Sequence, residues 1–375
     1  MSARAIGACL CLCLGGCASS SRDRAWLSDE LRARLGPAAD EGAPGRPVEL
    51  SDGLDEAEVV ALTLARSPAL RAELSRIDAA RATLDEANRP PNPQLNLMGA
   101  LGLATSSVAA LLAPLEWLWQ LPARSRAAAR DADATAEAVL MRALDLVRDA
   151  RLLHVELGLA IDRAALRAQL AVQAAELARL AAVRAGLGES GPLEARLFAA
   201  DAQVSEDASA LASTEVTVAR ARLWAQLALD EAAPVQVSFS DARVGVPSLQ
   251  VLVARARDHR PDARSAALAI SAVVARTGWE RSRAFSVGAL VEGHWSEAAG
   301  GALRLGARVE LPLFGLNPGG VGRAEAELLR ATAQHEVVAR TVVLEVTAAR
   351  ARMLQAEASR ARFEQAVLPA LDAAL

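Results

Sequence analysis

Apolar positions along this chain recur with the spacing of long, closely packed helices. Between residues 123 and 185 they alternate at intervals of four and three, at Val139, Ala143, Leu146, Ala150, Leu153, Leu157, Ala160 and Ala164. This heptad spacing predicts a coiled-coil helix. A second helix, ending near Asp230, carries its own apolar stripe at Leu193, Leu197, Ala200, Val204, Leu211 and Val218. Together the two segments predict a long antiparallel hairpin.

The turn of this hairpin contains Arg184, Gly186, Gly188, Ser190, Gly191 and Pro192. Glycine lets the chain reverse, and a proline suits the first turn of the helix that follows. Chain reversal alone accounts for these residues. The exposed end of a coiled coil is also a place where a partner protein can dock.

Other stretches alternate between apolar and polar residues, which is the pattern of β-strands. One face of residues 303–311 is apolar, and the other carries Arg304, Arg308 and Glu310. Residues 94–97 and 285–291 alternate as well, while the apolar stretch 108–115 fits either a strand or a helix. Strands of about nine to eleven residues with one apolar face are typical of transmembrane barrels. A soluble hairpin with one buried face has the same pattern.

The order of helix, alternating stretch and helix occurs twice. Pro261 lies 193 positions after Pro68, each proline is near the start of an Ala-rich helix, and the same offset aligns Leu290 with Leu97. We therefore expect a mainly α fold with a small β part, in which neither repeat closes a core alone.

Repeat 1 is expected at residues 51–235 and repeat 2 at residues 245–375. The first helix is expected to begin near Ser51, a good N-cap residue type. In each repeat the strands lead to the next helix through a proline-containing turn, at Pro122 and at Pro318, and the glycines that follow Pro318 are expected in that turn.

The N-terminus has the features of an exported lipoprotein. Residues 1–17 combine Arg4 with a short apolar segment, which is typical of a signal peptide. They end in Leu14-Gly15-Gly16-Cys17, which resembles a lipobox, so Cys17 is expected to be lipidated. The alternative is an ordinary signal peptide with a chance cysteine. Residues 18–50, rich in glycine and proline, are expected to form a tether.

These features together resemble the TolC-like outer-membrane efflux proteins. The resemblance covers about residues 55–375. It rests on the two helix starts around Pro68 and Pro261, the junction at residues 90–97, the segment 122–129, the hairpin turn and the segment 311–319. The Arg-rich segment at residues 124–126 is more similar to the heavy-metal branch of the family than to the multidrug branch.

The resemblance implies a homotrimer whose twelve strands form one β-barrel in the outer membrane, continued across the periplasm by a helical α-barrel. Arg304, Arg308 and Glu310 would face the barrel lumen. Residues 184–192 would form the periplasmic tip, where an adaptor protein linked to an inner-membrane pump docks. Cys17 would carry lipid, including palmitate. The exported substrate would be a small molecule or a metal ion.

Composition excludes several other functions. The chain has 375 residues, a net charge of −4, and no lysine, so no basic block predicts nucleic-acid binding. Its histidines, at positions 154, 259, 294 and 335, are scattered without metal-ligand spacing, and His294 is expected beyond a strand. All four cysteines lie within residues 1–17. We expect no catalytic residues, cofactor or metal site.

Two other functions remain open. One is a periplasmic adaptor or structural lipoprotein that uses the hairpin only to bind partners. The other is a truncated, non-conducting channel, because aligning Pro318 with Pro122 places Leu375 opposite Arg179. On that alignment repeat 2 lacks a tip and a return helix, and an apolar face on residues 323–367 is left without a partner.

Overall fold

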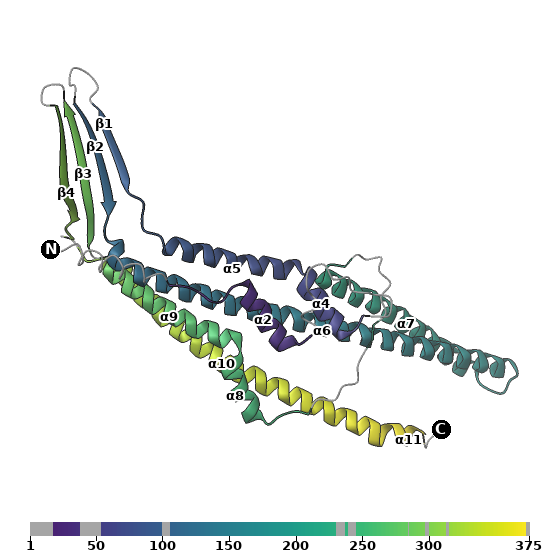
Figure 1. The fold of residues 1–375 in the computed structure, drawn as a ribbon. Helices are drawn as coiled ribbons and strands as arrows, with labels where there is room; N and C mark the ends of the chain where they lie inside the picture. The colour runs from purple at the N-terminus through teal and green to yellow at the C-terminus, as the bar shows by residue number, and fades with distance from the viewer. Residues whose placement is uncertain are drawn as a thin grey trace. The chain divides into compact units, whose positions relative to one another are not determined.

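The structure is a computed structural model that describes residues 18–37, 54–99, 106–229, 237–238, 245–283, 285–296, 300–312 and 315–372 (Figure 1). The chain divides into two compact units. Unit 1 contains Met1–Trp26, Ser75–Met141 and Gly245–Leu375, and unit 2 contains Leu27–Leu74 and Arg142–Val244. None of the described helices has the length and apolar character needed to span a membrane.

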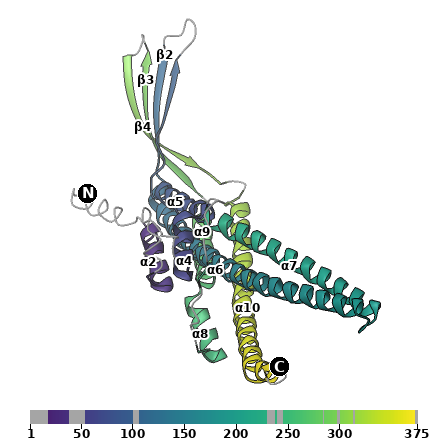
Figure 2. The ribbon, with the colours of Figure 1, turned by 90° about the vertical axis from the view of Figure 1, so that its right-hand side faces the viewer.

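Within the described residues of unit 1, four strands form one antiparallel sheet and lie in sequence order (Figure 1; a second view is given in Figure 2). The strands are β1 (Gln94–Gly99), β2 (Ser106–Pro114), β3 (Ser286–Ser296) and β4 (Gly300–Glu310). Because β2 pairs with β3, the strand pair of repeat 1 continues into that of repeat 2. The expected mainly α fold with a small β part is confirmed, and the ambiguous stretch 108–115 is largely strand β2.

The first helix of each repeat is broken into two. Repeat 1 has α4 (Glu56–Arg66) and α5 (Pro68–Ala87), and repeat 2 has α8 (Leu249–His259) and α9 (Pro261–Ser282). Pro68 and Pro261 each occupy the first residue of a helix, where a missing N–H costs little. The first helix, expected to begin near Ser51, is therefore two helices in its described part, separated at Ser67. The helix α4 starts after Asp55, which forms a capping box with Glu58.

Both proline-containing turns are in fact helical. Pro122 lies inside α6 (Trp117–Gly186), and Pro318 is the first residue of α10 (Pro318–Arg362), which continues through η1 (Phe363–Val367) and α11 (Leu368–Asp372). The expected turn at the glycines after Pro318 is wrong, because Asn317 caps α10 by accepting a hydrogen bond from the Gly320 N–H. A Cβ atom on Gly320 would lie 2.4 Å from Glu280 Oε2 and 2.5 Å from the Asn317 amide, so glycine leaves room for the Asn317 cap and its hydrogen bond to Glu280.

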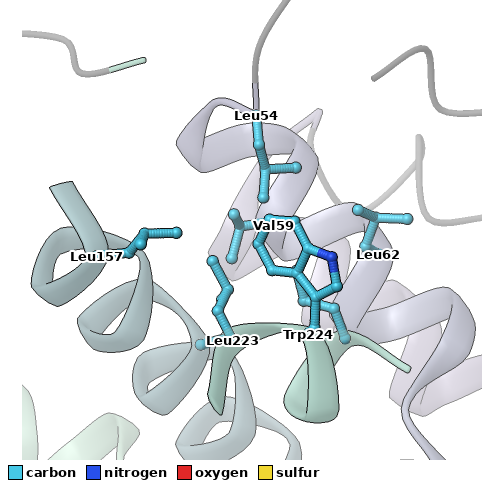
Figure 3. Packing of buried hydrophobic residues seen from close by; sticks show 8 residues of the cluster. Leu54, Val59, Leu62, Leu157, Leu223 and Trp224 are labelled. Carbon is cyan, nitrogen blue, oxygen red and sulfur yellow. The ribbon is translucent and has the colours of Figure 1, made fainter. Parts of the chain in front are cut away.

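Unit 2 is built around the hairpin of α6 and α7 (Pro192–Leu227), together with α4 and most of α2 (Arg24–Leu35). Its core cluster joins α4, α6 and α7 (Figure 3), and contains Leu54, Val59, Leu62, Ala150, Leu157, Leu223, Trp224 and Leu227. The predicted heptad seam of α6 is buried from Val139 to Ala150 and at Leu157 and Ala160.

The predicted apolar stripe of α7 does not form the seam of the hairpin. Leu193, Leu197, Val204, Leu211 and Val218 are all exposed, whereas the buried positions are Ala212 and three large residues near the end of α7. The less exposed positions along the rest of α7 are mostly small residues, among them Ala202, Ser205 and Ala208. Small side chains let two helices approach closely, which leaves the large residues facing outward.

Candidate functional site

The two faces of the sheet differ sharply in polarity. Residues paired across antiparallel strands share a face, so the register assigns every strand residue to one of two sets. The apolar face carries one polar side chain, Ser107; its members are Leu95, Leu97, Gly99, Ser107, Ala109, Leu111, Ala113, Val287, Ala289, Val291, Gly293, Trp295, Gly301, Leu303, Leu305, Ala307 and Val309. The polar face carries every charged side chain of the four strands.

The charges of the polar face belong to β3 and β4. Arg304, Arg308 and Glu310 lie on it together, as the sequence predicts for one side of a strand. Arg304 is paired with Glu292 across the strands, and Glu292 Oε2 lies 3.2 Å from His294 Nε2. The expectation that His294 lies beyond the strand is wrong, because it is paired with Val108 and Ala302 inside the sheet. Gln94 and Asn96 of β1 continue this face.

The offset that relates the two repeats does not hold within the strands. Leu97 lies on the apolar face, whereas Leu290, which the 193-residue offset aligns with it, lies on the polar face. The offset describes the helix starts at Pro68 and Pro261 only.

Trp295 covers the apolar face near the β3–β4 turn. Its indole lies over Gly293, where a Cβ atom would be 2.5 Å from the ring, and beside Gly301, its cross-strand partner. Tryptophan at the edge of an apolar band is typical of a membrane–water interface.

The N-terminal strap, residues 18–26, packs on the helices of unit 1. Its main anchors are Arg22 and Ser20. Ser20 Oγ donates a 2.7 Å hydrogen bond to Asp133, and Arg22 lies 3.5 Å from Glu137, whose carboxylate is fully buried and also 3.6 Å from Arg264. An unpaired carboxylate at such a site is costly, so these arginines stabilise the packing of the strap and α9 on α6.

The ends of the strap are held as well. Asn88 lies six residues before the start of β1. Its side-chain amide donates a hydrogen bond to the carbonyl of Ala18 at 3.1 Å. Asp23 accepts a hydrogen bond from the Trp26 N–H and pairs with Arg81, and these two interactions lower the pKa of its carboxyl. The residue that follows Cys17 is thereby fixed at the base of the sheet.

Ion pairs connect the helices below the sheet. Arg276 forms ion pairs with Asp131 of α6 at 2.6 Å and with Glu327 of α10 at 2.9 Å. Burial disfavours the charge of the guanidinium, but these ion pairs outweigh burial and raise its pKa. Arg260 is held similarly by Asp262 and by Glu345 of α10, which also raises its pKa against burial. These contacts fix α9 between α6 and α10.

The N-terminal part of α6, residues 117–137, contacts the strap on one side and lines a cavity on the other. Successive helical residues are rotated by about 100°, so Asp133 and Glu137, which hold the strap, project roughly opposite to Trp117, Leu121 and Arg124. The latter side lines a cavity that also touches Ser286 and Glu310 of the polar face. The strap and the polar face of the sheet therefore lie on opposite sides of α6.

The hairpin tip of unit 2 is a tight, well-capped turn. The Glu189 N–H bonds to the Arg184 carbonyl at 2.9 Å and the Gly188 N–H to the Ala185 carbonyl at 3.1 Å, with Gly188 at φ +76°. This is a Schellman motif, which requires a left-handed residue at Gly188. Gly191 is then the N-cap of α7 and Pro192 its first residue. Leu187 and Leu193 flank the turn and are each 70% exposed.

The remaining predicted residues are not brought to a common site. Cys17 and the other cysteines lie outside the described residues. Within the described ranges no group of His, Cys, Asp and Glu is arranged to hold a metal ion. His154 is buried, and its Nε2 lies 2.8 Å from the Leu54 carbonyl. The strap contacts and the cavity were not predicted, because both join residues far apart in the sequence.

Comparison with solved structures gives consistent similarities over most of the chain. A membrane protein from Pseudomonas aeruginosa is 20% identical, with a TM-score of 0.68 over 86% of this chain and 89% of that protein. The outer membrane protein VceC from Vibrio cholerae is 14% identical, with a TM-score of 0.67 over 84% of this chain and 83% of VceC.

A third structure, CusC, was described for the conformational changes that accompany folding and transmembrane channel formation. It is 19% identical, with a TM-score of 0.61 over 86% of this chain and 82% of CusC. No family model and no curated protein matches the sequence. At these identities the similarity establishes the fold: the chain has the TolC-like fold of the outer-membrane efflux channels.

Proposed function

We propose that this protein is the outer-membrane channel of an efflux system, through which small molecules or metal ions leave the periplasm. The observation that carries the proposal is the separation of the two sheet faces. An apolar face with one polar side chain suits lipid, and a face with five titratable residues suits water. The solved structures of the same fold include outer-membrane channels.

A channel of this kind requires several copies of the chain. The outer backbone groups of β1 and β4, the edge strands of the sheet, have no partner strand among the described residues. Unpaired backbone groups in lipid cost several kcal/mol each. Four strands are too few to close a barrel, since about eight form the smallest ones. A homotrimer, with twelve strands, satisfies both constraints.

The hairpin of unit 2 supports the same assembly. Leu166 and Leu170 of α6 and Leu211 of α7 line one groove of about 440 Å³ on its surface. The exposed α7 stripe continues beside this groove for most of the helix. Apolar heptad stripes of this length normally pack against further helices. In the proposed trimer, helices of the α-barrel cover them.

Lipid attachment at Cys17 is supported by the strap. The bond from Asn88 to Ala18 holds the residue after Cys17 close to the base of β1. An acyl chain must enter the bilayer outside the barrel, and the strap lies on the side of α6 opposite to the polar face. Mass spectrometry of the native N-terminus tests this part. A diacylated or triacylated Cys17 is expected, and cleavage elsewhere would rule the anchor out.

The tip residues Arg184, Gly186, Gly188, Ser190, Gly191 and Pro192 are proposed to dock a periplasmic adaptor coupled to an inner-membrane pump. The exposed side chains of Leu187 and Leu193 beside this turn would supply the apolar contact area. Cross-linking from Ser190→Cys to a co-expressed adaptor is expected, and Ser213→Cys, on an exposed part of α7, is the matched control. Equal adducts at the two positions, or none at Ser190, would contradict docking.

A periplasmic adaptor or structural lipoprotein is the second candidate function. It predicts that the apolar face of the sheet is buried against protein. The two functions are distinguished by labelling single cysteines. The test positions are Leu303 and Leu305 on the apolar face, and the control positions are Arg304 and Arg308 on the polar face. The channel predicts that a water-soluble maleimide labels only the controls, whereas a lipid-soluble reagent labels only the leucine positions. The second candidate predicts that neither reagent labels the leucine positions, because protein covers them. Labelling of both sets by the water-soluble reagent would contradict a lipid-facing side and indicate a hairpin exposed to water.

A further inference from the structure

A cavity lies where the sheet meets the helices, between the first turns of α6 and the last turns of α9. Its volume is about 390 Å³, which is within the range of about 300–1,000 Å³ that binds small ligands. We call it the junction cavity and define it by its side chains with a charge or an indole ring: Glu116, Trp117, Arg124, Trp279, Arg283 and Glu310.

Two buried polar atoms beside the junction cavity have no hydrogen-bond partner among the described residues. They are Trp279 Nε1, which can only donate, and Glu116 Oε2, which accepts. Leaving such an atom unsatisfied costs about 1–3 kcal/mol. Both side chains line the cavity, but these two atoms are buried, so a ligand in the cavity satisfies them only when the side chains turn toward it.

The charges of the junction cavity are balanced but not paired with one another. Arg124 donates to the carbonyls of Ala87 and Arg89, which hold its guanidinium in place without neutralising it. Arg283 lies over the Trp279 ring, 5.2 Å from its centroid, and forms an ion pair of 3.3 Å with Glu280, which does not line the cavity. Glu116 and Glu310 form no ion pair within the described part of the chain. Two cationic and two anionic groups therefore surround one space.

We propose that the junction cavity binds a small zwitterionic solute with an aromatic or aliphatic body, such as an amino acid or a compound of similar charge. Its anionic group lies beside Arg124 and Arg283. Its ammonium lies beside Glu116 and Glu310, and its body packs against Trp117. Because Ser286 and Glu310 of the polar face line the cavity, the proposal rests on the proposed function, in which this face borders the water-filled pore.

Three probes with one aromatic body test this assignment: L-phenylalanine, 3-phenylpropanoate, which lacks the ammonium, and 2-phenylethylamine, which lacks the carboxylate. Binding to the full-length protein in detergent is measured by saturation-transfer difference NMR. L-Phenylalanine is expected to bind about tenfold more tightly than either analogue, the ratio that one lost charge interaction of roughly 1.4 kcal/mol produces.

Two variants remove one charge each from the cavity. Arg283→Gln is expected to abolish the preference for L-phenylalanine over 2-phenylethylamine, and Glu310→Gln the preference over 3-phenylpropanoate. Arg281→Gln is the control, because Arg281 is on the same helix but pairs with Glu325 instead of lining the cavity. Equal affinity for all three probes would show apolar binding only, and absence of binding would show that the cavity holds water; either result overturns the proposal.

Conductance of the same preparations in planar bilayers separates this proposal from the proposed function. A conducting pore that binds no probe would refute the zwitterion site alone. Selective binding of L-phenylalanine by a protein that forms no pore would support the site and refute the channel.

Discussion

Replacing Leu305 by arginine tests the lipid-facing side of the sheet. Leu305 is in the middle of the eleven residues of β4, is 80% exposed, and is paired with Val291 on the apolar face. Arginine on the lipid side of a barrel costs about 2–4 kcal/mol at the bilayer midplane. Leu305→Arg is therefore expected to lower the folding equilibrium constant roughly 30- to 700-fold.

Leu112→Arg is the matched control on the polar face. Leu112 is paired with Leu290, which is paired with Gly306, so it lies within one residue of the depth of Leu305. Its cross-strand neighbour on β1 is Gln94, and Glu292 is diagonal to it, so an arginine there meets polar partners.

Urea-induced unfolding in lipid vesicles, followed by tryptophan fluorescence, gives both free energies. Leu112 is half-buried, so the control is expected to lower the free energy of unfolding, but by less than Leu305→Arg because the new arginine meets polar partners instead of lipid. Equal destabilisation by the two arginines, or a larger effect at Leu112, would refute the assignment of faces.

Three further predictions concern the helices and the strap of unit 1. Gly320→Ala is expected to lower the free energy of unfolding by about 1 kcal/mol, because its Cβ would displace the Asn317 side chain that caps α10. Gly278→Ala, with open space around it, is expected to be neutral or stabilising when the two variants are compared by thermal unfolding. Arg276→Gln is expected to cost about 1 kcal/mol, since its side chain is 35% exposed and its ion pairs are partly screened; an unchanged melting temperature would contradict a role for these pairs. The pKa of Asp23 is lowered, so its contribution to stability is fully present above the ordinary carboxyl pKa of about 3.9 and is lost as the pH falls through the lowered value. The protection factors of the amides in residues 18–26, which correct for the intrinsic exchange rate, should therefore fall in acid, and Asp23→Asn should remove that fall.

Periodicity predicted those parts of the fold that depend on neighbouring residues. The alternation at residues 303–311 placed Arg304, Arg308 and Glu310 on one face, because side chains alternate in any strand whatever it packs against. The heptads of α6 predicted buried residues at Val139 and Ala143 for a similar reason.

Patterns failed where packing between distant segments decides the outcome. A stripe of large residues on α7 resembles a coiled-coil seam, but the Ala-rich face allows closer contact with α6, and Leu197 and Val204 remain outside. Proline and glycine at Pro122 and Gly320 suggested turns, yet helix packing retains both within helices. The pairing of Arg22 with Glu137 joins residues more than a hundred positions apart, and no local pattern indicates it.

Ion selectivity of the reconstituted full-length protein tests the central claim most directly, because it depends both on the existence of a pore and on the face that lines it. The double variant Arg304→Glu/Arg308→Glu reverses two charges per chain on the polar face. The channel predicts a stable conductance whose reversal potential in a salt gradient shifts toward cation selectivity in this variant, while Arg281→Glu, on α9, shifts it much less. A pore with unchanged selectivity, or a protein that never conducts, would contradict the account.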